Sequence, residues 1–140
     1  MASVSIEKDM LTYLKTQATV TNWVGTGNNA RIYWTAAPDA LSTAETYPYI
    51  VYFTVAVDGT LQFIGTKSVD ALIQFSVFHT HATNGLTLAN AVFDVLSAYH
   101  GSPGAKTIYF ITCNGPRVLL DPDYDNLYHY VVDAAVQYER

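Results

Sequence analysis

The stretch from Asp70 to His100 constrains the fold more than any other part of the chain, because it joins two different periodicities. Its first nine residues alternate between the two faces of a strand, although Leu72 and Phe78 interrupt the polar face and predict that this face is covered too. After His81, apolar residues recur at helical spacing. A strand that leads straight into an amphipathic helix buries both apolar surfaces when the helix folds back over the sheet.

A first helix is predicted over about residues 4 to 18, where apolar side chains share one face. Glu7 and Asp9 lie in its first turn, where the helix dipole favours negative charge. The segment from Thr19 to Ala30 is rich in Gly and Asn, which predicts turns rather than a regular element.

The remaining pattern predicts an α+β fold. Thr83 or Asn84 is the expected N-cap of the helix that follows the central strand, and Gly101 followed by Pro103 is expected to end it. The predicted strands are residues 31–33, 49–57, 61–66 (a short returning strand or a projecting arm), 70–78, 107–113 (broken by Asn114-Gly115-Pro116) and 128–138. We expect one mixed or antiparallel sheet with two helices on one face, in the order α-β-β-(β)-β-α-β-β.

The bulk composition bounds the organisation and the partners. The 140 residues suit a single domain, 1–140, with possible projecting loops at 34–47 and 58–69. Eleven Tyr exceed what a core of this size easily hides, which favours oligomerisation. The formal charge is −5 without any basic run, so the chain has no cation cluster for nucleic-acid binding.

The same composition indicates where the chain is made. Cys113 is the single cysteine, so no intrachain disulfide can form and synthesis in a reducing cytoplasm is expected. There is neither a signal peptide pattern nor an apolar run that could span a bilayer, and no membrane partner is expected.

Histidine and cysteine chemistry has weak support. His79 and His81 lie two apart at a strand end and share a face, but no third ligand stands at metal-binding spacing beside them. Cys113 lies in a strand pattern with no positive neighbour to lower its pKa, so we interpret it as a buried, inert thiol rather than a nucleophile.

Three further motifs fail on inspection. The run 121–126 resembles the opening of a calcium loop, but Asn126 stands where Gly is needed and Val132 where the bidentate Glu is needed, so a turn is expected. The glycines of GTGNNAR lack the Lys of a phosphate loop, and no GxSxG is present. No catalytic residue, cofactor site or metal site is predicted, and the chain is not expected to be an enzyme.

What remains is surface suited to partners. The candidate interface residues are Trp34, Tyr47, Leu61, Phe63, Ile64, Asp121, Asp123, Tyr124 and Tyr128. An exposed arm with apolar residues is an aggregation liability unless it docks on something. The alternative is that these rings only cover the edge of the core.

The order of these pieces resembles the tail terminators, also called tail completion or minor tail proteins, of long-tailed phages and gene transfer agents. The resemblance covers most of the chain. It is carried by the first helix and its turn, Arg31-Ile32-Tyr33 followed by Pro38, YPYIVY at 47–52, FSVF at 75–78, Ala89 and Ala91 before Val95-Leu96, LLDPD at 119–123 and the YHYVVD strand. The long 34–47 loop and the low charge depart from the family pattern.

The resemblance implies a structural virion protein. Such subunits assemble as a hexameric ring on the head-proximal end of the tail tube, end tube polymerisation and present a surface to the head–tail connector. The ring would satisfy exposed sheet edges on neighbouring copies, and an acidic lumen would let DNA pass without binding.

Two alternatives stay open at this point. The chain could be another neck component that shares the ring geometry, such as a head-closure or tube protein. It could also be a small metal-dependent enzyme that uses His79, His81 and the turn from Asp121 to Asp125, provided that those groups converge in one cleft.

Overall fold

The chain folds as an α+β protein, as predicted. The computed structural model describes residues 6–27, 30–35, 48–58, 62–63, 66–104, 106–119 and 127–139. The elements are α1 (Ile6–Lys15), α2 (Ala18–Val24), β1 (Ile32–Trp34), β2 (Tyr49–Asp58), β3 (Gln62–Phe63), β4 (Thr66–His79), α3 (Ala82–Leu96), β5 (Ile108–Leu119) and β6 (Tyr128–Glu139). Within these residues no helix has the length and apolar character that a bilayer span requires.

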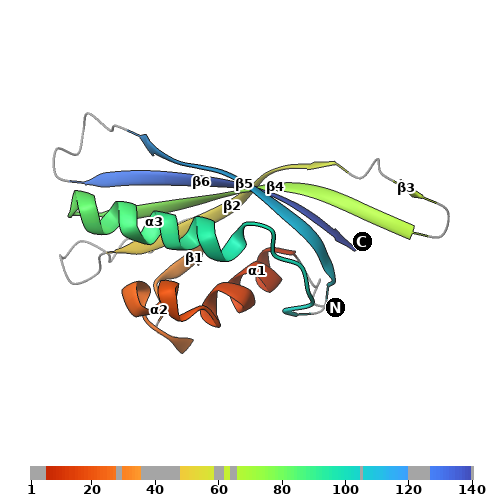
Figure 1. Cartoon of the computed structure of the whole chain (residues 1–140), viewed down its shortest axis with the longest axis horizontal. Coiled ribbons are helices and arrows are strands. Elements are labelled where there is room, and N and C mark those ends of the chain that lie inside the picture. The colour runs from red at the N-terminus through yellow and green to blue at the C-terminus, as the bar shows by residue number, and fades with distance from the viewer. Residues whose placement is uncertain are drawn as a thin grey trace.

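The sheet has the strand order β1-β2-β4-β6-β5, and β3 pairs with the end of β4. β1 runs parallel to β2, whereas the other neighbours are antiparallel. Figure 1 shows the three helices on one side of this sheet. We call the opposite side, over which no described helix lies, the open face.

The predicted strand and helix of residues 70–100 are confirmed, and they organise the rest. β4 is the central strand and pairs with β2 on one side and with β6 along most of its length on the other. Its helix-facing side chains meet those of α3, α1 and β6 in one core. The largest fully buried side chains are Tyr52, Phe75, Met10, Leu14, Ile50, Ile73, Leu88, Leu96, Ile108 and Ile111.

The N-terminal region differs from the prediction, since it contains two helices instead of one helix and a turn. α1 ends at Lys15, and α2 forms where turns were expected. Its sequence is poor in strong helix formers, but Val20 and Val24 are both fully buried at helical spacing, and this tertiary burial overrides the local preference. Arg31 fixes the end of α2, because its guanidinium donates to the Trp23 carbonyl at 2.8 Å.

α3 begins and ends at other residues than predicted. Its N-cap is His81, whose Nδ1 accepts the backbone N–H of Asn84, so neither Thr83 nor Asn84 has that role. The helix ends at Leu96, well before Gly101, since Ala98 has a φ of 62° and donates its N–H to the Ile111 carbonyl of β5. The helix therefore ends where the chain turns back toward the sheet.

β5 is one continuous strand where a break was predicted. The segment Asn114-Gly115-Pro116 is accommodated as a bulge between residues that pair with Asp133 and Val131 of β6. The sharp turn needs Gly115, whose φ is 110°, and the Gly115-Pro116 bond is cis.

The outer edge of β5 is closed along part of its length. Gly101 and Ile108 exchange two backbone hydrogen bonds, of 2.9 and 2.7 Å, and the N–H of Ala98 reaches Ile111 at 2.9 Å. Further along, Pro116 has no N–H to offer to another strand. These features protect an edge strand from pairing with another chain.

The end of the β2–β4 hairpin projects as an arm. Ser68 is the first residue of β4 that pairs with β6, so Thr66 and Lys67 pair only with β3 among the described strands. We define this two-stranded part, Gln62–Phe63 with Thr66–Lys67, as the arm, and Figure 1 shows it extending beyond the helices. The predicted projection at 58–69 thus contains a short returning strand, whereas Leu61 and Ile64 lie outside the described residues.

Candidate assembly surface

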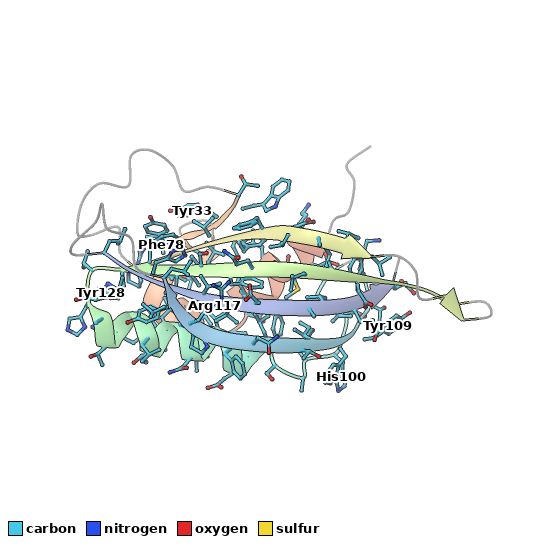
Figure 2. All side chains as sticks on the ribbon, turned by 90° about the horizontal axis from the view of Figure 1, so that it is seen from above. Tyr33, Phe78, His100, Tyr109, Arg117 and Tyr128 are labelled. Atoms are coloured by element: carbon cyan, nitrogen blue, oxygen red, sulfur yellow. The ribbon has the colours of Figure 1, made fainter. Side chains whose placement is uncertain are left out.

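The open face of the sheet carries the candidate site, and it divides into three zones along the strands. Figure 2 shows this face, with Tyr33, Phe78 and Arg117 labelled on it. At one end of the strands lies a row of aromatic rings, in the middle lie polar groups, and toward the arm lie exposed apolar side chains. The register of the strands fixes these zones, because residues directly opposite each other share a face.

Four rings cross the sheet side by side, and we call them the aromatic row. Tyr33 of β1 lies 6.3 Å from Tyr49 of β2, measured between ring centroids. Tyr49 stacks on Phe78 of β4 at 5.0 Å, and Phe78 stacks on His129 of β6 at 4.2 Å. All four are only partly buried, so part of each ring is exposed. Such pairs contribute about 0.5–1.5 kcal/mol each beyond their burial.

The middle of the open face carries one ion pair. The Arg117 guanidinium lies 3.3 Å from Oδ2 of Asp133 across β5 and β6, and its side chain is 52% exposed. Gln74 lies opposite Asp133 in register on β4. A pair this exposed contributes at most about 1 kcal/mol to stability. Because the cation is matched by a carboxylate, this zone offers no excess positive charge to a phosphate backbone.

Toward the arm, the open face exposes an apolar patch made by Val55, Leu72, Phe110 and Ala135. Val55 lies in the bulge of β2, where Thr54 faces α1 and the next residue faces outward. Leu72 is opposite Ala135 of β6. Phe110 of β5 is opposite Gln137, the next residue of β6 on the same face. Val55 is 51% exposed, Leu72 36% and Phe110 46%. The prediction that this face is covered is met only in part, because Ser76 and Val131 on the same face are 3% and 0% exposed whereas Leu72 remains 36% exposed.

The predicted interface residues fall into two groups. Trp34 and Tyr128 are exposed, at 57% and 37%, and lie on β1 and β6 with two strands between them. Phe63 is in β3. The others lie outside the described residues: Tyr47, Leu61, Ile64, Asp121, Asp123 and Tyr124. The aromatic row was not predicted, although Tyr49, Phe78 and His129 each fall on the non-core parity of their strands, which is a signal that pairing register would have revealed.

His79 and His81 lie together at the start of α3, with ring centroids 6.3 Å apart. Nδ1 of His79 accepts the N–H of His81 at 3.4 Å, and Nδ1 of His81 accepts that of Asn84 at 3.3 Å. Burial lowers the pKa of His79 below its usual 6.5, and the neighbouring His81 lowers it further. Among the described residues no three His, Cys, Asp or Glu side chains gather as metal ligands would, and the Asp121–Asp125 turn lies outside them.

Cys113 is a partly buried thiol on the helix side of β5. It pairs with Ala134 and packs against the core. Burial raises its pKa from 9.0 to about 11. This agrees with the interpretation as an inert thiol, since the thiolate needed for nucleophilic attack is disfavoured.

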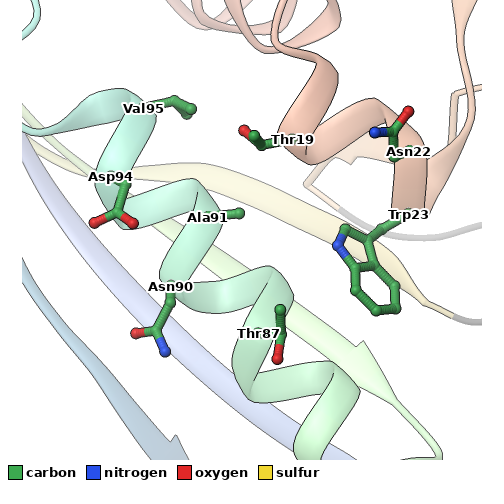
Figure 3. A pocket seen from close by; sticks show the side chains of 8 residues that line it. All are labelled: Thr19, Asn22, Trp23, Thr87, Asn90, Ala91, Asp94 and Val95. Carbon is green, nitrogen blue, oxygen red and sulfur yellow. The ribbon is translucent and has the colours of Figure 1, made fainter.

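A groove of about 580 Å³ runs between α2 and α3 on the helix side (Figure 3). Trp23, Asn22 and Thr19 line it from α2, and Thr87, Asn90, Ala91, Asp94 and Val95 line it from α3. Asp94 is the one carboxylate among these lining residues. The groove therefore offers no second carboxylate for paired acid–base chemistry.

Comparison with solved structures finds a chain described as belonging to the virion of a native gene transfer agent (GTA) particle. The TM-score is 0.68 at 13% sequence identity, and the match covers 99% of this chain and 100% of that chain. At this identity the likeness establishes a shared fold along the length of both chains. No protein-family model matches the sequence, and no curated protein matches it either.

Proposed function

We propose that this chain is a structural subunit of a phage-like virion and that it acts as a tail terminator. In this role, six copies form a ring on the head-proximal end of the tail tube, stop the addition of tube protein and meet the head–tail connector. The observation that carries the proposal is the end-to-end fold match with a virion chain of a gene transfer agent particle. The order of sequence motifs from Arg31 to Asp133 supports the same class.

The surface chemistry suits association rather than catalysis. The aromatic row, Trp34 and Tyr128 present amphipathic rings, the side chains most enriched where proteins bind proteins. The apolar patch at Leu72 and the projecting arm would be liabilities on a chain that stayed alone. A ring of identical copies can give each of them a partner, because a head-to-tail contact closes into a ring when the rotation between neighbouring copies divides a full turn.

The negative charge of the chain is compatible with the passage of DNA through such a ring. The chain carries a formal charge of −5, and the ion pair on the open face leaves Arg117 matched by Asp133. An acidic wall repels phosphate, so DNA would pass without being held.

Electron microscopy of tail tubes mixed with the protein tests the proposal. We expect a single cap at one end of each tube, and overlong tubes when the protein is omitted during tube assembly. Stacks of many rings would identify a tube protein instead, and binding to the connector alone would identify a head-closure protein. Either outcome, or no binding to tubes, overturns the terminator role.

A variant pair makes the test specific to the surface. Trp34→Ala combined with Tyr128→Ala removes exposed rings and should reduce capping at least tenfold with little loss of stability. The control is Leu86→Ala, which removes a comparably exposed side chain from α3. Equal capping by both variants would show that the rings of β1 and β6 are not at the interface.

A further inference from the structure

The solvent side of α1 is positively charged, although the helix contains as many acidic as basic residues. Both of its carboxylates are turned toward their own chain. Glu7 accepts a hydrogen bond from the Thr54 hydroxyl of β2, and Asp9 is buried. Lys8 is exposed and Lys15 is partly exposed on the other side of the helix. The charge that α1 presents to a partner is therefore cationic.

An apolar side chain lies between these two lysines. Leu11 follows Lys8 by three residues and precedes Lys15 by four, which is the spacing of neighbours on one face of a helix. Leu11 packs against the core on one side and is only partly buried. We call Lys8, Leu11 and Lys15 the α1 stripe. Its two cationic positions are about 10.5 Å apart along the helix axis.

Negative charge surrounds the apolar patch on the open face. Asp70 lies at one end of the patch, two residues before Leu72 on β4, and Asp133 lies toward the other end on β6. Glu139 is exposed on the same face of β6. Among the described side chains of this face the one cation is Arg117, which pairs with Asp133. The patch therefore combines an apolar centre with an acidic rim, and it suits a partner with the opposite charge.

The two surfaces also agree in length. Asp70 pairs with Gln137, which is four residues from Asp133 along β6, so the two acidic positions are about 13 Å apart along the strands. The lysines of the α1 stripe are about 10.5 Å apart, and their long side chains span the difference. With Leu11 over the patch, each lysine can reach one carboxylate.

The α1 stripe and the patch cannot meet within one molecule, because α1 lies on one side of the sheet and the patch on the other (Figure 1). We propose that the α1 stripe of one copy packs on the apolar patch of the next copy, with its lysines beside Asp70 and Asp133. The inference rests on the proposed ring and names the surfaces through which its copies meet. Since the two surfaces differ, the contact is heterologous and runs in one direction around the ring.

Site-specific crosslinking tests this contact. In a Cys113→Ala background, Thr12→Cys labels α1 beside Leu11, and Leu72→Cys labels the patch; Thr12 is exposed. A short bismaleimide should give covalent dimers when the two variants are mixed and none with either variant alone. On tail tubes, a chain with both substitutions should give a ladder of bands that ends at six. Leu86→Cys on α3 in place of Thr12→Cys is the control and should give no ladder.

Charge reversal with rescue tests the ionic match. Asp70→Lys should lower the crosslinking yield at least tenfold. Adding Lys8→Glu or Lys15→Glu to the same chain should restore it, and the lysine that does so gives the direction of the helix across the patch. Asp94→Lys changes the charge of the exposed surface of α3 by the same amount and should leave the yield unchanged.

The possible outcomes separate this contact from the ring itself. Crosslinks within one single-label variant would mean a two-fold contact and overturn the inference. An unchanged yield with Asp70→Lys, or no rescue by either lysine substitution, would overturn it as well. Rings seen by electron microscopy without these crosslinks would overturn the contact and leave the ring in place. Absence of rings, both free and on tubes, would overturn the ring and this contact together.

Discussion

Asp9 and Lys106 are joined across 97 residues by a hydrogen bond of 2.8 Å, in which the Lys106 backbone N–H donates to Oδ2 of the buried Asp9 carboxylate. The carboxylate also lies so close to Gly104 that a Cβ there would stand 2.2 Å from Oδ1. α1 therefore holds the segment between α3 and β5 in place.

Replacing Asp9 by Ala should destabilise the fold. The partly buried N–H of Lys106 would lose a charged acceptor, a change that costs about 1–3 kcal/mol in the free energy of unfolding. Urea denaturation measures it, with the exposed Asp94→Ala as the control, for which we expect a change within about 0.5 kcal/mol. Equal effects of the two substitutions would contradict the role of Asp9.

Gly85→Ala should also lower stability, although alanine is the better helix former. The added Cβ would stand 2.9 Å from Cε2 of Tyr130 and 3.1 Å from Cβ of His79. Overpacking costs about 1–3 kcal/mol, which exceeds the gain of about 1 kcal/mol in helix propensity. The exposed Asn90→Ala on the same helix gains propensity without a clash. An unfolding temperature that rises for both variants would disprove the close contact.

Acid should weaken the start of α3. The folded chain lowers the pKa of His79 below its usual 6.5, so the unfolded chain binds the proton more readily. The stability that neutral His79 contributes to the fold is therefore complete above about pH 6.5. It is lost as the pH falls through that value toward the lowered pKa. His79→Asn keeps an acceptor for the His81 N–H and should flatten the fall in Tm between pH 7 and 5, measured by circular dichroism. If Tm falls as steeply with pH in the variant as in the unmodified protein, His79 is not the source of the acid sensitivity.

Cys113 should react slowly with a thiol reagent in the folded protein. Its pKa of about 11 leaves about one thiolate per thousand chains at pH 8, and the side chain packs against the core. A Ser97→Cys variant supplies an exposed thiol in the same chain. This thiol should be labelled fast, whereas Cys113 should be labelled fast only after denaturant unfolds the protein. Labelling of both thiols at one rate would show that Cys113 is accessible.

The sequence was sufficient to predict the elements whose burial pattern is local. The alternation into β4 and the helical spacing in α3 predicted both, because one amphipathic surface determines each. α2 was missed because its helicity comes from burial of Val20 and Val24 in the shared core, and not from its composition. The continuity of β5 was missed because β6 holds the strand on both sides of the Gly115-Pro116 bulge.

The assembly surface was only partly visible for a similar reason. Single exposed rings such as Trp34 and Tyr128 follow from composition and position. The aromatic row depends on which strands are neighbours and in what register, and Tyr49, Phe78 and His129 are far apart in the chain. Likewise, Asp9 lies in the first turn of α1, as predicted, but its hydrogen bond to Lys106, 97 residues away, could not be predicted from the helix pattern.

The closed outer edge of β5 bears on how growth stops. A sheet whose last strand is free can recruit further strands without end, which is the route to fibres. Here Gly101 and Ala98 occupy the first part of that edge and Pro116 interrupts the second. Along this edge, a second copy therefore finds no continuous row of free backbone groups to pair with. If the chain is a virion subunit, as proposed, copies that meet on this side do so through side chains.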